Sequence, residues 1–286
     1  MRWGSGIVTS RRNDARSDRP ARLRGGAPQG HWRLLVDGPR DGPTNMAVDE
    51  ALARGCAEGW APPTLRLYRW SVPTVSLGYN QAAHGAVDLA ACGRRGVGVV
   101  RRVTGGRALL HQHELTYSLA LPTPAGHRGV LTDYRWISRC LLLAVQRLGV
   151  PATISRGQTP QEAGGLCFLS TSRYELTVGG RKLIGSAQRR FTSALLQHGS
   201  LLIELEHAAW SALFPQGRDL EARATALRLL LGRSPGWEEL VEALRAGFEA
   251  GAAVSLEPGG LTAKEESVVQ ELVVKRYGTT EWTLRR

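Results

Sequence analysis

The glycine pair Gly179-Gly180 constrains the fold of this chain more than any other feature of the sequence. Residues 174–190 read YELTVGGRKLIGSAQRR, and apolar and polar side chains alternate on both sides of the glycines. Such alternation is typical of β-strands, and two glycines between strands favour a tight hairpin turn because they tolerate positive φ. A two-residue turn places Thr177 opposite Lys182. The sequence therefore predicts an antiparallel hairpin here.

Lys182, on the second strand of this hairpin, is an unusual residue in this chain. Only three of the 37 basic residues are lysines, and the other 34 are arginines. Side chains alternate along a strand, so Lys182 shares a half-apolar face with Ile184 and Ser186. A lysine retained in such a composition can do what arginine cannot, which is to lose its proton when desolvated. A surface lysine that reaches water is the alternative, and composition does not separate the two.

The order of the predicted elements favours an α+β fold. The strands are predicted at 32–37, 64–70, 74–78, 97–102, from the glycines at 105–106 to 121, and 193–205. The helices are predicted at 43–55, 131–148, 237–248 and 262–277. Because strands and helices do not alternate regularly, we expect a mixed or antiparallel central sheet flanked by helices, and no doubly wound fold.

Charge divides the chain into two parts. Residues 1–30 carry seven arginines and two aspartates, a net charge of +5, without a periodic apolar pattern. We expect a basic, disordered N-terminal extension at 1–30 and a single domain at 31–286. The remaining +7 of the formal charge of +12 suits acidic protein partners. It does not indicate nucleic-acid binding, because no helix-turn-helix, zinc-finger or aromatic RNA-binding motif accompanies it.

The apolar runs of the sequence are short. None approaches the ~20 residues that cross a bilayer, and no apolar core follows the N-terminal arginines as it would in a secretory signal. We expect a cytoplasmic protein that does not bind membranes.

A glycine break at Gly105-Gly106 interrupts the strand-like sequence. Its spacing fits neither a P-loop nor a dinucleotide-binding fingerprint. Two adjacent glycines let a backbone approach a ligand closely. Arg101, Arg102 and Arg107 flank them with guanidiniums suited to phosphate or carboxylate. A β-bulge with surface arginines is the alternative.

The histidines give weaker indications. His111 and His113 form an H-x-H pattern, but no further His, Cys or acidic residue lies at a familiar ligand spacing, so no metal site is expected. His198 is either an acid–base group or a packed histidine.

Covalent chemistry has one candidate pair, Cys167 with Lys182. The four cysteines are far apart and should be reduced, and Cys140 lies in an apolar helical pattern typical of a core. Cys167 differs, because it follows a polar loop and precedes the hairpin. A partly desolvated lysine could accept the thiol proton and offset the thiolate charge. Spacing does not show that the two meet, and a small buried cysteine is an equal alternative.

Four sequence blocks resemble the lipoate–protein ligase and octanoyltransferase family, which is related in fold to biotin–protein ligases. They are GPTNMAVDEAL (42–52), LRLYRWSVPTVSLGYNQ (65–81), RRVTGGRALLHQHELTYSLALP (101–122) and YELTVGGRKLIGSAQRR…LQHGSLL (174–202). The resemblance spans roughly residues 32–286 and includes the ending RYGTTEW at 276–282. It implies a class II aminoacyl-tRNA synthetase/biotin–lipoate ligase-like fold. Residues 31–286 would then be a single acyltransferase catalytic domain, with an acyl tunnel beside Gly105 and Gly106.

The resemblance also implies roles for individual residues. Lys182 matches the active-site lysine of the family, and Cys167 matches the nucleophile of its octanoyltransferases. The acyl-binding and pocket-forming positions correspond to Arg102, Gly105, Gly106, His111, Tyr117, Gly185, Ser186 and Ala187. Gly-Gly-Arg followed by Ala is most like the LipM-type octanoyltransferases. Gln112 departs from the family, which usually has Asp there.

The implied activity is transfer of an octanoyl group from acyl carrier protein, through a Cys167 thioester, to a lysine of a lipoyl domain or glycine-cleavage H protein. The resemblance implies no cofactor for this reaction and no nucleic-acid or membrane partner. Three alternatives remain at this stage. They are a lipoate–protein ligase that uses ATP and Mg²⁺ without the cysteine, an amidotransferase between lipoyl domains, and a protein that binds without catalysis.

Overall fold

The computed structural model describes residues 30–124, 129–157, 174–214 and 220–286. Within these residues the strands form an eight-stranded sheet, in the order β11-β1-β2-β6-β10-β9-β8-β7, and a three-stranded sheet, β4-β3-β5. The strands are β1 (His31–Val36), β2 (Thr64–Tyr68), β3 (Thr74–Leu77), β4 (Gly98–Arg101), β5 (Leu109–His111), β6 (Glu114–Pro122), β7 (Thr153–Ile154), β8 (Leu176–Val178), β9 (Arg181–Arg190), β10 (Ala194–Leu202) and β11 (Ser255–Pro258).

The large sheet is mixed, as the sequence predicted. Strand β1 runs parallel to both β11 and β2. From β2 through β6, β10, β9, β8 and β7 every neighbouring pair is antiparallel. Short connections such as the β8–β9 hairpin join antiparallel neighbours, whereas the parallel pairs need long crossovers. The α+β class is therefore confirmed.

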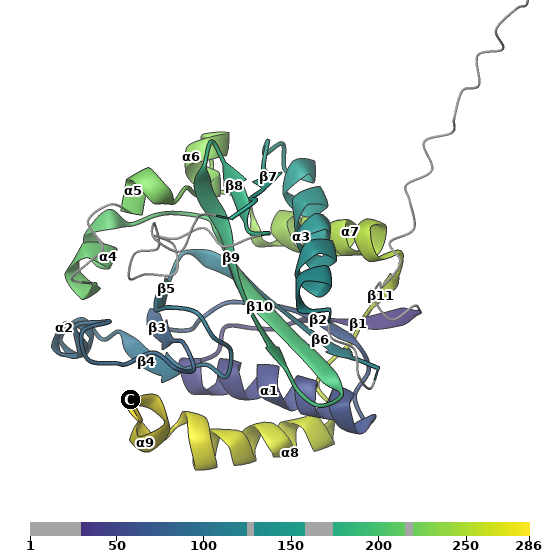
Figure 1. The fold of residues 1–286 in the computed structure, drawn as a ribbon, viewed down its shortest axis with the longest axis horizontal. Coiled ribbons are helices and arrows are strands. Elements are labelled where there is room, and N and C mark those ends of the chain that lie inside the picture. The colour runs from purple at the N-terminus through teal and green to yellow at the C-terminus, as the bar shows by residue number, and fades with distance from the viewer. Residues whose placement is uncertain (1–29, 125–128, 158–173, 215–219) are drawn as a thin grey trace, which may run out of the picture.

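Helices cover both faces of the large sheet (Figure 1). Helices α3 and α7 pack on one face with Leu34 of β1, and α1 and α8 pack on the other with Leu35, because successive side chains of a strand point to opposite faces. The helices are α1 (Gly42–Glu58), α2 (Leu89–Arg94), α3 (Val130–Arg147), α4 (His207–Leu213), α5 (Leu220–Arg223), α6 (Leu227–Leu231), α7 (Trp237–Ala252), α8 (Ala263–Leu272), the π-helical turn η3 (Val273–Tyr277) and α9 (Thr280–Thr283).

Most predicted elements are present, although several differ in extent and some were not predicted. Helix α1 continues past Gly55 to Glu58 and ends at Gly59, whose left-handed backbone closes it. The predicted helix 262–277 has the expected Thr262–Glu265 capping box but changes to a π-helical turn after Leu272. Strand β11 was not predicted, because its four residues form a strand by pairing with β1, and local sequence carries little of that information.

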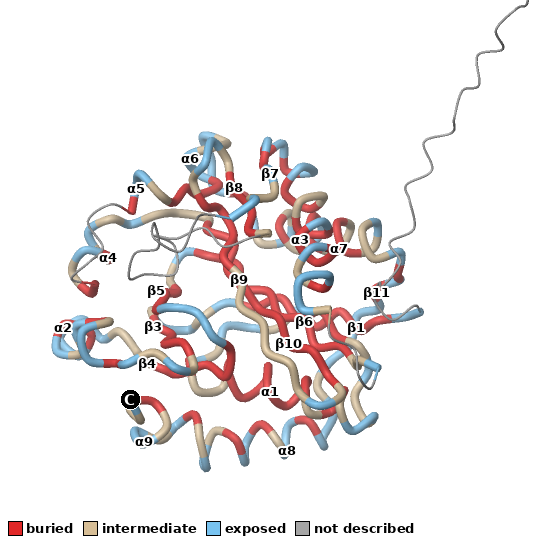
Figure 2. Tube along the Cα trace, viewed as in Figure 1, coloured by how far each residue is buried: buried red, intermediate tan, exposed pale blue. Residues whose placement is uncertain are grey.

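The buried residues follow the central strands and the inner faces of the helices (Figure 2). Strands β6 and β10 are almost entirely buried, since they lie in the middle of the sheet with helices on both faces. None of the helices in the described ranges combines the length and the apolar character that a bilayer crossing requires. The predicted extension lies outside the described residues except for Gly30, so the division at residue 30 stays a prediction.

Candidate active site

The predicted hairpin is formed by β8 and β9. Its register places Thr177 opposite Lys182 and Val178 opposite Arg181, as a two-residue turn requires. Gly179 and Gly180 have φ values of 56° and 76°. These left-handed values explain why two glycines occupy the turn.

Lys182 is buried, with 1% of its surface exposed, which excludes a lysine that reaches water. Its Nζ lies 2.6 Å from Oε1 of Glu175, whose side chain is also buried. The backbone carbonyl of Lys182 accepts a hydrogen bond of 2.9 Å from the amide of Thr225. Burying a charge is costly unless an opposite charge accompanies it, and Glu175 supplies that charge. Sequence reasoning missed Glu175, because nothing in its spacing marks it as the partner of Lys182.

Cys167 lies outside the described residues, so its pairing with Lys182 stays a prediction. The three described cysteines, Cys56, Cys92 and Cys140, are all buried and reduced. Burial raises the pKa of the Cys56 thiol and of the Cys140 thiol to about 12. Those two side chains are therefore uncharged near neutral pH and unsuited to nucleophilic attack.

A pocket with an empty volume of about 350 Å³ lies between the two sheets. The lining residues come from α1, the strands β2, β3, β5, β6, β9 and β10, and the segments beside them. They are Met46, Tyr68, Trp70, Ser76, Arg102, Leu109, His111, Thr116, Gly185, Ser186, Ala187, His198, Gly199 and Ser200.

Five of the predicted binding residues line this pocket, namely Arg102, His111, Gly185, Ser186 and Ala187. Tyr117 lies behind them, with its hydroxyl 2.7 Å from that of Ser186. Gly105 and Gly106 form the exposed loop next to Arg102 and do not line the pocket themselves.

The glycine loop packs against the end of β3. A Cβ atom on Gly78 would lie 1.9 Å from the carbonyl oxygen of Gly106, so only glycine fits at position 78. The Arg102 guanidinium donates to the carbonyl oxygens of Gly105 and Arg107 at 2.8 Å and to that of Ser76 at 2.9 Å. The sequence interpretation assigned the Arg102 guanidinium to the binding of an anion. In the structure this guanidinium fixes the loop through these contacts and also lines the pocket, so a role in binding stays a prediction.

Arg101 is also structural. Its guanidinium is buried and donates to the carbonyl oxygens of Gly78, Gln81 and Thr283. Backbone carbonyls satisfy most of its donors, so the sequence interpretation of Arg101 as an anion ligand does not hold. Arg107 is exposed.

His111 belongs to one wall of the pocket. Its Nδ1 lies 2.5 Å from Oε1 of Glu114, and its Nε2 lies 2.7 Å from the hydroxyl of Ser76. The ring stacks on Trp70 with a centroid separation of 4.0 Å. His113 points elsewhere, since it is about half exposed and its nearest carboxylate is that of Glu206. Among the described residues no group of His, Cys, Asp and Glu side chains could hold a metal ion.

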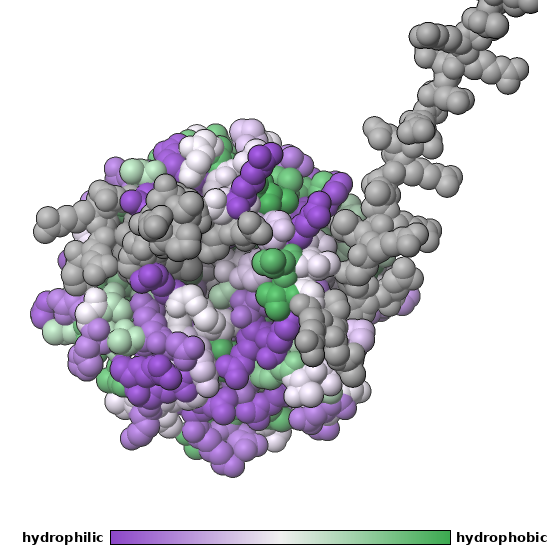
Figure 3. Space-filling view, in the orientation of Figure 1, coloured by the Kyte–Doolittle hydropathy of each residue, from purple (hydrophilic) through white to green (hydrophobic). Residues whose placement is uncertain are grey.

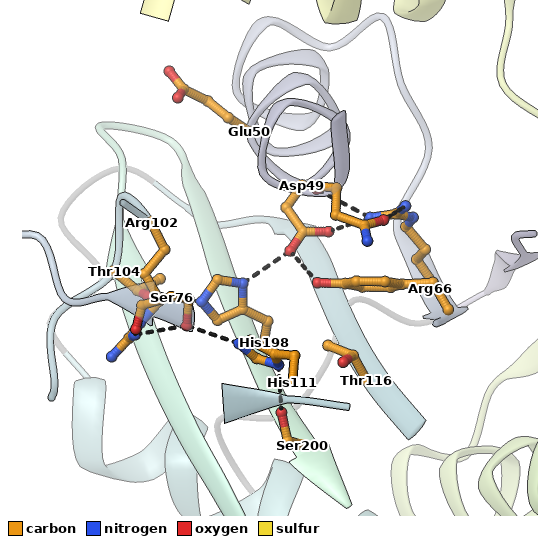
Figure 4. A network of polar contacts seen from close by, with 12 residues as sticks. Asp49, Glu50, Arg66, Ser76, Arg102, Thr104, His111, Thr116, His198 and Ser200 are labelled. Atoms are coloured by element: carbon orange, nitrogen blue, oxygen red, sulfur yellow. Dashed lines mark hydrogen bonds and ion pairs between the residues drawn. The ribbon is translucent and has the colours of Figure 1, made fainter. Parts of the chain in front are cut away.

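Next to His111, a buried network joins α1 to the sheet (Figure 4). Oδ2 of Asp49 lies 2.8 Å from Nδ1 of His198 and accepts a hydrogen bond of 3.0 Å from the Tyr68 hydroxyl. Nε2 of His198 lies 2.7 Å from the hydroxyl of Thr104, next to the glycine loop. Arg66 donates to Oδ1 of Asp49 at 2.9 Å. The wall of the pocket and the glycine loop are thus held by one chain of contacts.

The pKa values of this network follow from burial and charge. Burial lowers the pKa of His198 more than the hydrogen bond and charge of Asp49 raise it. For Asp49, the contacts with His198 and Arg66 outweigh the opposing effect of burial and lower its pKa. Burial and the Asp49 charge place the pKa of Tyr68 well above its usual value. At neutral pH the network therefore consists of a carboxylate, a neutral imidazole and a neutral phenol.

The chain matches the family model of the lipoyl protein ligase A/B catalytic domain over residues 41–249, which is most of its length. It belongs to this family.

Relatives within the lipoyl protein ligase family are similar over nearly the whole chain. An octanoyltransferase LipM of Symbiobacterium thermophilum is 44% identical over 271 residues, which cover 90% of this chain and 99% of the relative. An octanoyltransferase LipM of Geobacillus kaustophilus is 40% identical, with coverage of 89% and 98%.

Solved structures of lipoate ligases share the fold. A Thermoplasma acidophilum protein with bound lipoic acid superposes with a TM-score of 0.78 at 26% identity, covering 91% of this chain and all of that one. A lipoate-protein ligase A bound with ATP gives a TM-score of 0.78 at 25% identity, with coverage of 89% and 98%. The biotin/lipoate ligase-like fold implied by the sequence is confirmed.

Several residues of the site were missed by sequence reasoning, among them Met46, Tyr68, Trp70, Thr116 and Ser200. A signal was available, because every residue that lines the pocket falls inside one of the four family blocks. Block membership alone, however, does not distinguish a pocket wall from a neighbouring core position.

Proposed function

We propose that this chain is an octanoyl-[acyl carrier protein]:protein N-octanoyltransferase that acts through a Cys167 thioester. The observation that carries the proposal is the similarity to octanoyltransferases over 90% of the chain, at up to 44% identity. Two features of the structure support it. One is a pocket between the sheets with apolar walls from Met46, Leu109 and Trp70, and the other is the buried Lys182–Glu175 pair on β9.

The pocket would hold the acyl chain, and the hairpin would act on its carbonyl end. Moving a hydrocarbon chain from water into contact with apolar side chains lowers the free energy. Gly185, Ser186 and Ala187 line the pocket, and Lys182 precedes them on the same strand. Lys182 does not line the pocket itself, so we propose that the thioester carbonyl lies at the Gly185 end, toward this lysine.

In the first half-reaction the Cys167 thiolate attacks the thioester carbonyl of the donor. Lys182, as an ammonium paired with Glu175, stabilises the developing oxyanion. As the C–S bond to the donor breaks, Lys182 gives a proton to the departing thiolate. The products are an acyl-enzyme thioester, the free thiol of the carrier and a neutral lysine.

In the second half-reaction the ε-amino group of an acceptor lysine attacks the acyl-enzyme. The amine loses a proton to Lys182, the C–N bond forms and Cys167 leaves as a thiolate. The product is an amide, and both groups of the enzyme return to their starting states. Since a thioester is exchanged first for a thioester and then for an amide, we propose that the reaction needs neither ATP nor a metal.

The proposed partners are octanoyl-acyl carrier protein as donor and a lipoyl domain or glycine-cleavage H protein as acceptor. A solved relative from Thermoplasma acidophilum, a bipartite lipoate protein ligase described with its E2 lipoyl domain, supports an acceptor of this kind. The proposal retains the cytoplasmic location expected from the sequence.

Intact-mass analysis after mixing the protein with octanoyl-acyl carrier protein, without ATP, tests the proposal. We expect a mass gain of one octanoyl group on the wild type and on Cys92→Ser, a cysteine buried outside the pocket. Cys167→Ser should gain none. Equal ATP-dependent lipoylation by the wild type and Cys167→Ser would instead establish a ligase, and octanoyl transfer only from another lipoyl domain would establish an amidotransferase.

A further inference from the structure

Arginines and aromatic rings form a layered surface near the C-terminus of the chain. The Arg285 guanidinium lies 4.0 Å from the ring centroid of Tyr79, and that of Arg189 lies 4.6 Å from it. Arg285 also lies 4.2 Å from the ring of Trp282, and Arg276 lies 4.8 Å from it. We call these five residues the arginine–aromatic patch. Stacking on rings fixes the plane of a guanidinium and leaves its edge available for hydrogen bonds.

Hydrogen bonds to the backbone hold the patch in place. Arg189 donates to the carbonyl oxygen of Val103 at 2.9 Å, and Arg285 donates to that of Tyr79 at 2.6 Å. The indole nitrogen of Trp282 donates to the carbonyl oxygen of Arg101 at 2.9 Å. The positive groups are therefore positioned before any partner arrives, which lowers the entropy lost on binding.

The positive charge of the patch is poorly compensated. Arg276 pairs with Glu50 at 2.6 Å, but neither Arg189 nor Arg285 forms an ion pair with a carboxylate of the described residues. The neighbouring Arg101 has a buried nitrogen, Nη2, that has no hydrogen-bond partner among them. Burial is the main cause of the lowered pKa of Arg101, and repulsion from the nearby Arg285 and Arg286 lowers it further.

The patch lies beside the proposed acyl pocket. Arg189 is two residues beyond Ala187 on β9, so both side chains lie on the same face of the strand. The carbonyl that binds Arg189 belongs to Val103, which precedes Thr104 of the pocket-wall network. The amide of Tyr79 donates to the carbonyl oxygen of Thr104 at 2.8 Å. Figure 3 shows hydrophilic surface extending over β4, α8 and α9, the region of the C-terminal part of the patch.

We propose that the arginine–aromatic patch docks the donor, an acidic protein that carries the acyl group. Carboxylates of the carrier pair with Arg189 and Arg285 while its acyl thioester enters the adjacent pocket. This inference rests on the proposed transferase function. Uncompensated arginine edges match carboxylates, and a position beside the pocket selects the molecule that delivers the acyl group.

Kinetics with two donors test the proposal. Octanoyl-acyl carrier protein is compared with octanoyl-N-acetylcysteamine, a small uncharged thioester, in the wild type and in the double variant Arg189→Gln/Arg285→Gln. We expect the ratio of the KM for the carrier-bound donor to the KM for the small donor to rise about tenfold, or about 1.4 kcal/mol. Added NaCl should raise this ratio in the wild type and have less effect in the variant. Arg147→Gln, an exposed arginine on α3, is the matched control and should keep the wild-type ratio.

Three outcomes would overturn the docking proposal. They are an unchanged KM ratio in the double variant, an equal loss with octanoyl-coenzyme A, which would indicate phosphate recognition, and an effect on the KM of the acceptor alone. Failure of the proposed function is a separate result, in which no thioester donor acylates the wild type.

Discussion

The hairpin pair and the pocket-wall network are both buried ionic groups, but they join different parts of the chain. Lys182 and Glu175 come from one stretch of 17 residues, 174–190, on neighbouring segments of the sheet. Asp49 and His198 are 149 residues apart, and Arg66 and Thr104 come from two further segments. A local pair can serve the chemistry without holding the fold together. A long-range network fixes α1, β2, β10 and the glycine loop relative to one another, so we expect its loss to affect stability first.

The largest expected effect is on catalysis, at Lys182. Lys182→Arg keeps the charge but should lower the rate of acyl transfer by about 10² to 10³, the range for loss of an oxyanion donor. A guanidinium is larger than the buried ammonium and does not give up a proton. The measurement is single-turnover octanoyl transfer to an acceptor domain.

Lys275→Arg is the matched control, because this exposed lysine forms an ion pair with Glu271 away from the pocket. It should retain the wild-type rate. Full activity in Lys182→Arg would remove the proton-transfer role assigned to the lysine.

The next effect is on stability, at Asp49. Asp49→Asn leaves the buried Arg66 without one of its two carboxylates, the other being that of Asp37. Removing one partner of a buried ion pair should lower the free energy of unfolding by about 3 kcal/mol. Urea unfolding followed by circular dichroism measures this change.

Glu239→Gln provides the comparison for Asp49→Asn, since Glu239 pairs with Arg233 at the surface of the protein. Its unfolding midpoint should stay near that of the wild type. If the two variants have the same midpoint, the network does not hold the fold as we infer.

The smallest effect is a pH dependence of stability at His198. Burial lowers the pKa of His198 in the folded state, so the unfolded chain binds this proton at higher pH than the folded one. Stability should therefore fall as the pH drops below about 6.5, by up to about 1.4 kcal/mol for each pH unit between the two pKa values. His198→Gln should reduce the difference between unfolding free energies measured at pH 7.5 and pH 5.5.

Working above pH 5 separates this effect from that of Asp49. The lowered pKa of Asp49 stabilises the fold above its ordinary value near 3.8 and is lost only as the pH falls below that. An identical pH dependence in the wild type and His198→Gln would show that the imidazole is not kept neutral by the fold.

The local sequence predicted those features that depend on neighbouring residues. The Gly179-Gly180 turn set the pairing of Thr177 and Val178 with β9, and Thr262 with Glu265 marked the start of α8. The four family blocks contained every residue that lines the pocket. Turns and caps could be predicted because their geometry involves only a few consecutive residues.

Only the tertiary structure decided what each charged side chain does. It buried Lys182 against Glu175, turned the Arg101 and Arg102 guanidiniums toward backbone carbonyls, and brought Arg189 and Arg285 onto Tyr79. These contacts depend on strand order and on how the two sheets pack, which join segments far apart in the chain. Burial then sets the energetic consequence, because a charge that is inexpensive in water must find a partner inside the protein.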